Sequence, residues 1–258
     1  MAVLGTPSIT VWAWQRDEDL SYIDPGKVSV AYLAGTIFIR GSSVRFRPCD
    51  RKLNLPPGTN AYPVFRIETI RSFPAHASGF KTSENDDIPT VDAASYAAKA
   101  IANHSSSFAR NNVSSKSVAC RQVQIDFDAF SDERTFYREL LRRLRHELPS
   151  GCKISITVLA SWLLADRWLE PACADEAVAM LFSMGPGKRE VLSSIRPGAL
   201  NSGAGIPIAL GISANEKSTN RALFERQIQK STGHLYIFSS RPWTQERLRA
   251  ITSEAQAR

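Results

Sequence analysis

Short apolar runs alternate with longer segments of helical periodicity along this chain. Eight of these runs are rich in Val, Ile, Leu and aromatic residues and are short enough to be strands. They cover residues 8–14, 28–33, 61–67, 122–128, 153–160, 177–183, 206–212 and 234–239. Strands that alternate with helices are typical of a parallel α/β sheet, and eight is the strand number of the (β/α)8 TIM-type barrel. The pattern therefore predicts such a barrel.

Helical periodicity falls between these runs, where a barrel needs its crossover helices. The segments are residues 91–108, 131–147, 188–195, 219–230 and 244–255. The clearest begins at Ser131, a good N-cap, and carries Phe136, Leu140 and Leu144 as one apolar stripe that should face the sheet. The connections after the first, fifth and sixth strands are short or irregular. One or two barrel helices are therefore expected to be degenerate or missing.

The connection after the second strand contains two further β-like runs within residues 36–48, separated by Gly41, Ser42 and Ser43. Because a short Gly-containing break between two such runs is typical of a hairpin, we expect a hairpin insertion here. It would decorate the barrel without adding a ninth strand to it.

The length and composition agree with one large α/β domain. The chain has 258 residues, of which 43% are hydrophobic and 22% charged. These values exclude disordered, collagenous and fibrous classes, and a barrel of this type needs roughly 250 residues. We expect a single barrel domain that spans residues 1–258.

The charge balance raises the question of an anionic partner. Lys and Arg exceed Asp and Glu to give a net charge of +7, which would suit a nucleic acid or another polyanion. However, the Arg-rich helical segment 134–145 contains Glu139, is followed by Glu147 and has a clear apolar stripe. This pattern favours a solvated outer face, so no nucleic-acid partner is expected.

Cysteine and histidine spacing predicts neither a metal site nor a redox motif. The residues concerned are Cys49, Cys120, Cys152, Cys173, His76, His104, His146 and His234. The cysteines are interpreted as buried or incidental thiols. Glycine-rich segments match neither a phosphate-binding loop nor a dinucleotide fingerprint, so no cofactor is expected.

The first fourteen residues contain no basic leader, and Gln15 and Arg16 follow before an apolar run could span a bilayer. The sequence as written therefore predicts no membrane span and a cytoplasmic protein. A start site chosen downstream of an export signal would instead predict a periplasmic or envelope-associated protein.

The main candidate for chemistry is the run from Gln124 to Asp128, with the sequence QIDFD. Side chains alternate faces along a strand, so Gln124, Asp126 and Asp128 share one face and Ile125 and Phe127 the other. In a barrel the polar face points into the lumen, and the strand's carboxyl end lies at the mouth where barrel active sites form. Adjacent carboxylates raise one pKa of the pair, which suits acid/base catalysis. In the alternative, Asp126 pairs with a buried Arg and Asp128 caps a helix.

The third strand carries Arg66 and Glu68 on one face, opposite large apolar residues. An inward Arg beside an inward Asp on the next strand would satisfy both charges. We therefore predict an ion pair between Arg66 and Asp126, with Glu68 level with Asp128 at the mouth. In the alternative, Glu68 is a solvated residue at the strand end.

Aromatic residues cluster near the predicted carboxyl ends of the strands and could stack on sugar rings or bases. The candidate ligand-binding residues are Trp12, Trp14, Gln15, Arg66, Gln124, Trp162 and Trp243. For any single Trp, packing in the core is the alternative.

Several segments together resemble a bacterial uncharacterised family, domain of unknown function 3142. They are residues 11–16 (VWAWQR), 65–69 (FRIET), 124–149 (QIDFDA and the helix after it), 154–164 and 175–185. The resemblance covers most of residues 8–243, and the QIDFDA block is its most specific part. It implies a (β/α)8-type barrel related to glycoside hydrolases, with no established activity.

The IDFD run also resembles the fourth-strand signature of chitinase-like glycosidases. In those enzymes a catalytic acid Glu follows the second Asp by two residues, whereas this chain has Phe130 there. If the resemblance is right, Asp128 or Glu68 must take the acid role, or the site binds sugar without cleaving it.

These patterns lead to a first hypothesis and two alternatives. In the first, a carbohydrate-active barrel hydrolyses a glycosidic bond with Asp126 and Asp128 as central carboxylates and Glu68 as second acid. In the second, the same barrel is an inert glycan-binding or interaction module. The third is a polyanion binder driven by net charge.

Overall fold

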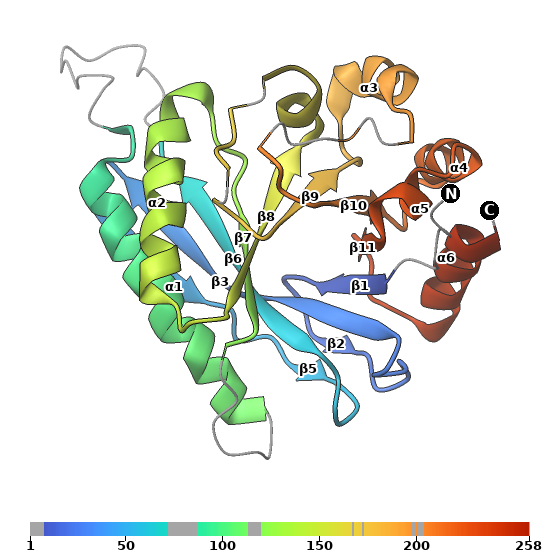
Figure 1. Ribbon diagram of the computed structural model, residues 1–258. Helices are drawn as coiled ribbons and strands as arrows, with labels where there is room; N and C mark the ends of the chain where they lie inside the picture. The colour runs from blue at the N-terminus through green and yellow to red at the C-terminus, as the bar shows by residue number, and fades with distance from the viewer. Residues whose placement is uncertain are drawn as a thin grey trace, which may run out of the picture.

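The computed structural model describes residues 8–71, 87–112, 120–166, 168–171, 173–197, 200 and 204–257. Eight parallel strands close into a barrel in the order β1, β3, β6, β7, β8, β9, β10 and β11, and β1 pairs with both β3 and β11 (Figure 1). The predicted (β/α)8 class is confirmed.

The barrel strands match the apolar runs of the sequence closely. They are β1 (Ser8–Ala13), β3 (Val28–Arg40), β6 (Ala61–Thr69), β7 (Gln122–Asp126), β8 (Lys153–Leu159), β9 (Glu176–Met180), β10 (Ile208–Ser213) and β11 (His234–Phe238). Outward residues such as Ile125, Ile156 and Ile237 are fully buried against the surrounding helices. Inward residues such as Trp12 and Tyr236 fill the lumen as a separate apolar cluster. The strands therefore bury both faces, which is typical of parallel sheets.

The predicted hairpin insertion forms as an extension of a barrel strand. Strand β3 continues beyond the barrel to Arg40, and β4 (Ser43–Pro48) returns antiparallel to it. Gly35 has no room for a side chain, because a Cβ there would lie 2.5 Å from the Phe46 ring. A further two-stranded parallel sheet joins β2 (Glu18–Asp19) to β5 (Leu53–Asn54).

The helices cover the barrel unevenly. They are α1 (Val91–Asn112), α2 (Arg134–Glu147), α3 (Lys188–Ser194), α4 (Lys217–Glu225), α5 (Ile228–Thr232) and α6 (Gln245–Ala257). Short helical turns occupy Ser131–Glu133, Trp162–Asp166 and Gly185–Gly187. Helices α1 and α2 lie side by side in Figure 1, and α4, α5 and α6 gather on the other side of the barrel.

In the described part of the crossover after β8, the helical element is the five-residue π-helical turn Trp162–Asp166, and the described segment between β1 and β3 contains no α-helix. This agrees with the expectation of degenerate or missing barrel helices. No helix within the described ranges is long and apolar enough to cross a membrane.

The interpretation of the cysteines was wrong for two of the four. Cys120 and Cys152 form a disulfide across 32 positions of sequence, with their Cα atoms 5.3 Å apart. They precede the adjacent strands β7 and β8, so strand pairing brings together two residues whose spacing gave no signal. Cys49 and Cys173 are free thiols.

Candidate active site at the barrel mouth

Three of the predicted carboxylates lie near the carboxyl ends of adjacent strands. Asp126 is the last residue of β7, Asp128 follows it by two positions, and Glu68 lies near the end of β6. Arg66 and Asp126 are directly paired in the parallel register of β6 and β7, so these side chains share the lumen face. The strand pattern therefore brings Asp126, Asp128, Glu68 and Arg66 to one side of the barrel mouth.

Asp126 is half-buried beneath this group, and Thr157 Oγ1 donates a 2.8 Å hydrogen bond to Asp126 Oδ1. Burial raises the pKa of Asp126 to about 6, and the negative charge of Asp128 adds to this effect. The Thr157 hydrogen bond and the charge of Arg66 act in the opposite direction. The side chain of Asp128 is more open to solvent. Desolvation raises the pKa of Asp128, against the opposing charge of Arg66.

The predicted ion pair between Arg66 and Asp126 does not form. Instead, Arg66 Nε lies 3.1 Å from Glu68 Oε1, with both side chains 37% exposed. The two partners are separated by one residue on the same strand, so they project from the same face toward the mouth. There the guanidinium stays partly hydrated, which avoids the cost of desolvating it deeper in the lumen.

Several predicted ligand-binding residues are buried and therefore not available at the surface. Trp12, Trp162 and Trp243 are at most 4% exposed, and Gln124 is fully buried. Trp12 Nε1 donates to Gln124 Oε1 at 2.6 Å inside the lumen. Trp243 Nε1 donates to the Trp12 carbonyl oxygen at 2.9 Å. The expected rim of exposed Trp side chains is wrong for these three, because their rings fill the space around and inside the barrel top.

Trp162 packs outside the lumen, where its ring centroid lies 4.9 Å from that of Trp168. It also contacts the Tyr137 ring, with centroids 6.4 Å apart. Trp162 is therefore a core residue beneath the helices.

The partly exposed aromatic residues at the mouth are Trp14, Phe182 and Phe238. The Phe182 and Phe238 rings are stacked, with centroids 5.4 Å apart and an interplanar angle of 6°. Trp14 meets Phe238 edge-on at 6.2 Å. Trp14 was among the binding residues predicted from the sequence, whereas Phe182 and Phe238 were not. Their inward parity on β11 and just after β9 was the available signal. Gln15 is exposed immediately after Trp14.

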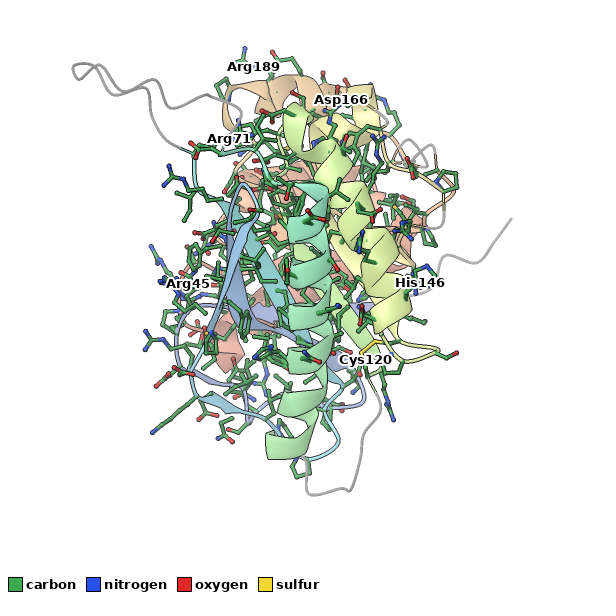
Figure 2. The ribbon with its side chains drawn as sticks, turned by 90° about the vertical axis from the view of Figure 1, so that its left-hand side faces the viewer. Arg45, Arg71, Cys120, His146, Asp166 and Arg189 are labelled. Atoms are coloured by element: carbon green, nitrogen blue, oxygen red, sulfur yellow. A yellow bond between two sulfur atoms is a disulfide. The ribbon has the colours of Figure 1, made fainter. Side chains whose placement is uncertain are left out.

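Phe130 stands where the chitinase-like signature has its acid. Its side chain is 59% exposed, and the Arg71 guanidinium lies 4.5 Å from its ring centroid. Arg71 also binds Asp132 at 2.7 Å and the fully buried Glu133 at 2.9 Å. Figure 2 shows Arg71 and Asp166 toward one end of the molecule and Cys120 toward the other. Position 130 therefore offers an exposed aromatic ring held by Arg71, and this ring has no proton to donate to a glycosidic oxygen.

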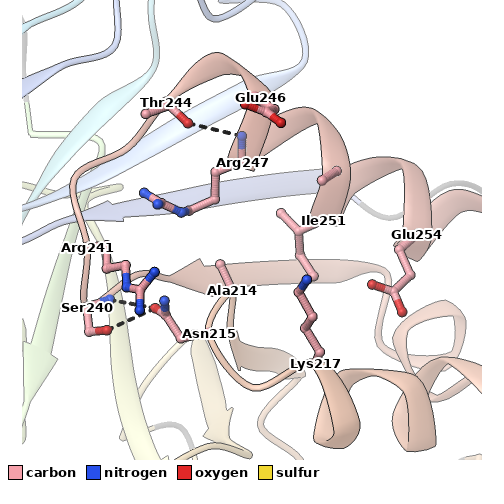
Figure 3. Close-up of a pocket in the computed structure, with 11 residues that line it drawn as sticks. Ala214, Asn215, Lys217, Ser240, Arg241, Thr244, Glu246, Arg247, Ile251 and Glu254 are labelled. Atoms are coloured by element: carbon pink, nitrogen blue, oxygen red, sulfur yellow. Dashed lines mark hydrogen bonds between the residues drawn. The ribbon is translucent and has the colours of Figure 1, made fainter.

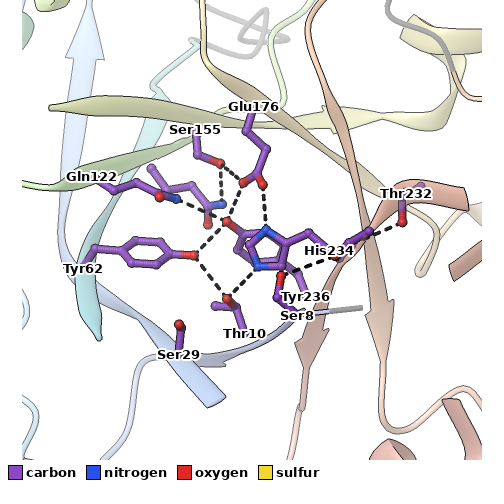
Figure 4. A network of polar contacts seen from close by, with 12 residues as sticks. Ser8, Thr10, Ser29, Tyr62, Gln122, Ser155, Glu176, Thr232, His234 and Tyr236 are labelled. Carbon is purple, nitrogen blue, oxygen red and sulfur yellow. Dashed lines mark hydrogen bonds and ion pairs between the residues drawn. The ribbon is translucent and has the colours of Figure 1, made fainter. Parts of the chain in front are cut away.

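A polar network that sequence analysis missed fills the opposite end of the lumen (Figure 4). Glu176 lies 2.7 Å from His234 Nδ1, and Tyr236 donates to Glu176 at 2.6 Å. Burial raises the pKa of Glu176, but the contacts with His234, Tyr236 and Ser155 outweigh it and hold the pKa below its usual value. The inward parity of His234 and Tyr236 on β11 was the signal for this network. It connects strands across the lumen and lies below the buried Trp12 layer.

The main cavities of the described residues lie away from Asp126, Asp128 and Glu68. A cavity of about 600 Å³ lies between α4 and α6, and its walls include Asn215, Lys217, Arg241 and Arg247 (Figure 3). Among the described residues, no group of three or more His, Cys, Asp or Glu side chains could hold a metal ion. His76 lies outside the described residues.

Comparison with known proteins shows the fold. No protein-family model and no curated protein matches this chain, so the resemblance to domain of unknown function 3142 stays a prediction. A Streptomyces coelicolor structure assigned as chitinase A aligns over 98% of both chains, with a TM-score of 0.53 and 10% identity. A chitinase from Rhizomucor miehei aligns over 97% of this chain and 99% of its own, with a TM-score of 0.51 and 10% identity. At such identities the similarity establishes a barrel fold shared with these proteins.

Proposed function

We propose that this barrel binds a carbohydrate across its mouth and hydrolyses a glycosidic bond there. The observation that carries the proposal is the pair Asp126 and Asp128 at the carboxyl end of β7, with the Asp126 pKa raised to about 6. Glycoside hydrolysis needs one protonated carboxyl and one carboxylate near the scissile bond. The fold shared with two chitinase structures supports the same class of ligand.

The proposed roles of the carboxyl groups follow from how exposed each side chain is at the mouth. Asp126 lies deeper, and its pKa of about 6 keeps it protonated in weakly acidic solution, where an ordinary Asp is ionised; the two carboxyls titrate as a pair. Asp128 is more exposed, so it is the member that reaches the glycosidic oxygen. The proton that the pair shares passes through Asp128 to that oxygen, which leaves both carboxyls ionised. Glu68 is held by Arg66 and supplies the carboxylate that stabilises the developing oxocarbenium charge or activates water. Trp14, Phe182 and Phe238 provide apolar surface for sugar rings.

A turnover screen tests this proposal. Wild-type protein, Asp128→Asn and the exposed control Glu246→Gln are assayed against chromogenic glycosides and polysaccharides. We expect Asp128→Asn to lower turnover by at least about two orders of magnitude while ligand affinity is nearly retained. Equal turnover in wild type and Asp128→Asn would contradict the catalytic role.

The second candidate is a glycan-binding module without catalysis, and Phe130 favours it. An exposed aromatic ring replaces the acid of the chitinase-like signature, and Arg71 holds it in place. This candidate predicts that wild type and Asp128→Asn bind the same saccharides with equal affinity and that neither turns them over. Calorimetry on the same panel, beside the turnover screen, separates it from the first.

We also propose that the protein works in an oxidising compartment such as the periplasm. The Cys120–Cys152 disulfide supports this, because disulfides persist mainly outside reducing cytoplasm. Alkylation of unreduced protein taken directly from cells should label Cys49 and Cys173 and leave Cys120 and Cys152 unlabelled. Labelling of all four would contradict the proposal.

A further inference from the structure

The extended hairpin presents two different faces. Ile37 and Ile39 are buried on one face, and Val44 and Phe46 pack against the same core. The other face carries Phe38 from β3 and Arg45 and Arg47 from β4; we call these three residues the hairpin face. Arg45 and Arg47 are exposed and Phe38 is half-buried. Figure 2 places Arg45 on the opposite side of α1 from His146.

The hairpin face continues the face that carries the mouth residues. In the register of β3 and β6, Thr36 pairs with Arg66 and Phe38 pairs with Glu68. Paired residues on neighbouring strands project from the same side of a sheet. Arg45 is in turn paired with Phe38, and Arg47 with Thr36. One continuous sheet surface therefore leads from Asp126 through Arg66 and Glu68 to the two arginines.

The two arginines are arranged around an aromatic ring, and no acidic partner of theirs lies among the described residues. Their guanidinium carbons lie 5.7 Å (Arg45) and 4.8 Å (Arg47) from the Phe38 ring centroid. No carboxylate in the described part of the chain forms an ion pair with Arg45 or Arg47, whereas Arg40 nearby is paired with Asp87 at 2.8 Å. A ring beneath the guanidiniums restrains them, and both arginines remain exposed to solvent.

This chemistry selects a particular ligand. A planar guanidinium forms paired hydrogen bonds with a carboxylate, and the Phe38 ring beneath Arg45 and Arg47 restrains both guanidiniums. Two restrained guanidiniums side by side suit a sugar chain that bears carboxylates. The positive charge of Arg45 and Arg47 complements the negative charge of such a sugar, and the hairpin face is continuous with the barrel mouth.

We propose that the hairpin face is a subsite for a carboxylate-bearing glycan, so that the substrate of this barrel is an acidic polysaccharide. The inference rests on the proposed carbohydrate function and names its substrate class. Arg45 and Arg47 bind the carboxylates of sugar units next to the one held at Asp126 and Asp128. Phe38 lies beneath the two guanidiniums and restrains them.

Matched saccharides test the subsite directly. The ligands are carboxylated oligosaccharides, namely oligogalacturonate, alginate and hyaluronan fragments, each beside its methyl ester, which keeps the sugar backbone and removes the charge. Binding is measured by calorimetry at low ionic strength. We expect wild type to bind at least one free acid at least about tenfold more tightly than its ester, the scale of a charge-assisted hydrogen bond.

Two double variants localise the effect. Arg45→Gln/Arg47→Gln should abolish the preference for the free acid, while affinity for the ester is retained. Arg221→Gln/Arg249→Gln changes the net charge equally at exposed positions on α4 and α6 and should leave the preference intact. Circular dichroism checks that both double variants fold. A similar loss in both double variants would mean that net charge alone attracts the ligand, and would overturn the subsite.

The remaining outcomes separate this inference from the proposed function. Asp128→Asn should keep the acid preference even though turnover falls. If wild type binds acids and esters equally, the subsite is wrong and the carbohydrate function stands. If none of these saccharides binds, the acidic-glycan subsite is wrong, and the chromogenic turnover screen alone decides the proposed function. Tighter binding of dextran sulfate or single-stranded DNA than of every carboxylated glycan would replace the subsite with general polyanion binding.

Discussion

At the scale of single residues, the depth of a side chain in the barrel decides whether it can meet a ligand. Alternation placed Asp126 and Glu68 on the lumen face, as the register of the barrel strands shows, and Trp12 lies in the lumen as well. Alternation could not tell a buried lumen position from an open one. Trp12 and Gln124 hydrogen-bond to each other inside the barrel, whereas Asp128 reaches the mouth. That difference depends on how far each strand extends relative to its neighbours.

The raised pKa of Asp126 has a consequence for stability. A folded-state pKa of about 6 lies above the ordinary Asp value of 3.8, so the folded protein binds more protons than the unfolded chain between these two pH values. Stability should therefore fall as the pH rises from about 4 to 6 and remain lower above that. Asp126→Asn removes this cost and should stabilise the protein at pH 8 by about 1–3 kcal/mol, with little gain at pH 4. Thermal melts across pH measure the difference. An equal effect at both pH values would contradict the burial of Asp126.

Glu176 should show the opposite pH dependence. Its pKa is lowered in the folded state, so its contribution is present above the usual carboxyl range and is lost as the pH falls. Glu176→Gln should destabilise the protein at pH 7 by about 2–4 kcal/mol, because hydrogen bonds from Tyr236 and Ser155 to a charged acceptor are weakened. Urea unfolding at pH 7 and at pH 4 should show this deficit shrinking at low pH. The exposed Glu246→Gln should unfold like wild type at both.

At the scale of elements, the strands were predictable and their contacts were not. The β3–β4 hairpin appears in the sequence as two β-like runs, but its role as an extension of β3 follows only from the pairing of Gly35 with both Pro48 and Phe65. The Arg66–Glu68 contact within one strand replaced the predicted contact between strands. A rotamer choice of this kind leaves no trace in the periodicity.

Gly35 tests whether the hairpin must pack as described. A Cβ at this position would lie 2.5 Å from the Phe46 ring and 2.6 Å from the Arg47 carbonyl oxygen. Gly35→Ala should destabilise the protein by about 1–3 kcal/mol, since backbone on one side cannot yield. Gly187→Ala is the matched control, because nothing lies within 4 Å of its added Cβ. Chemical denaturation compares the two. Equal stability would show that the hairpin is packed more loosely.

At the scale of the whole molecule, the eight-stranded barrel was the most predictable feature. Eight apolar runs separated by longer polar or helical segments leave few alternatives once both faces of a parallel sheet must be buried. The disulfide was not predictable, since it depends on β7 and β8 being neighbours. The lumen network was equally scattered in sequence: Thr10, Tyr62, Glu176 and His234 meet only when the barrel closes (Figure 4).

The disulfide should contribute to global stability. It closes a loop across 32 positions, for which restriction of the unfolded chain gives about 2–4 kcal/mol. Cys120→Ser/Cys152→Ser should therefore lower the melting temperature, and a reducing agent should affect wild type but not this variant. Cys49→Ser, which removes a free thiol, should keep the sensitivity to reduction. A wild type whose melting is unchanged by full reduction would contradict the contribution.

The most direct test of the proposed chemistry is the titration of one carboxyl group. Carbon-13 NMR of the side-chain carboxyls, assigned with Asp126→Asn and Asp128→Asn, follows the protonation of the pair in the folded protein. The structure predicts that Asp126 titrates near pH 6 and that the midpoint falls in Asp128→Asn, because a neighbouring negative charge is removed. An Asp126 midpoint at or below 4, unchanged by Asp128→Asn, would contradict a proton held at the barrel mouth and with it the proposed acid/base site.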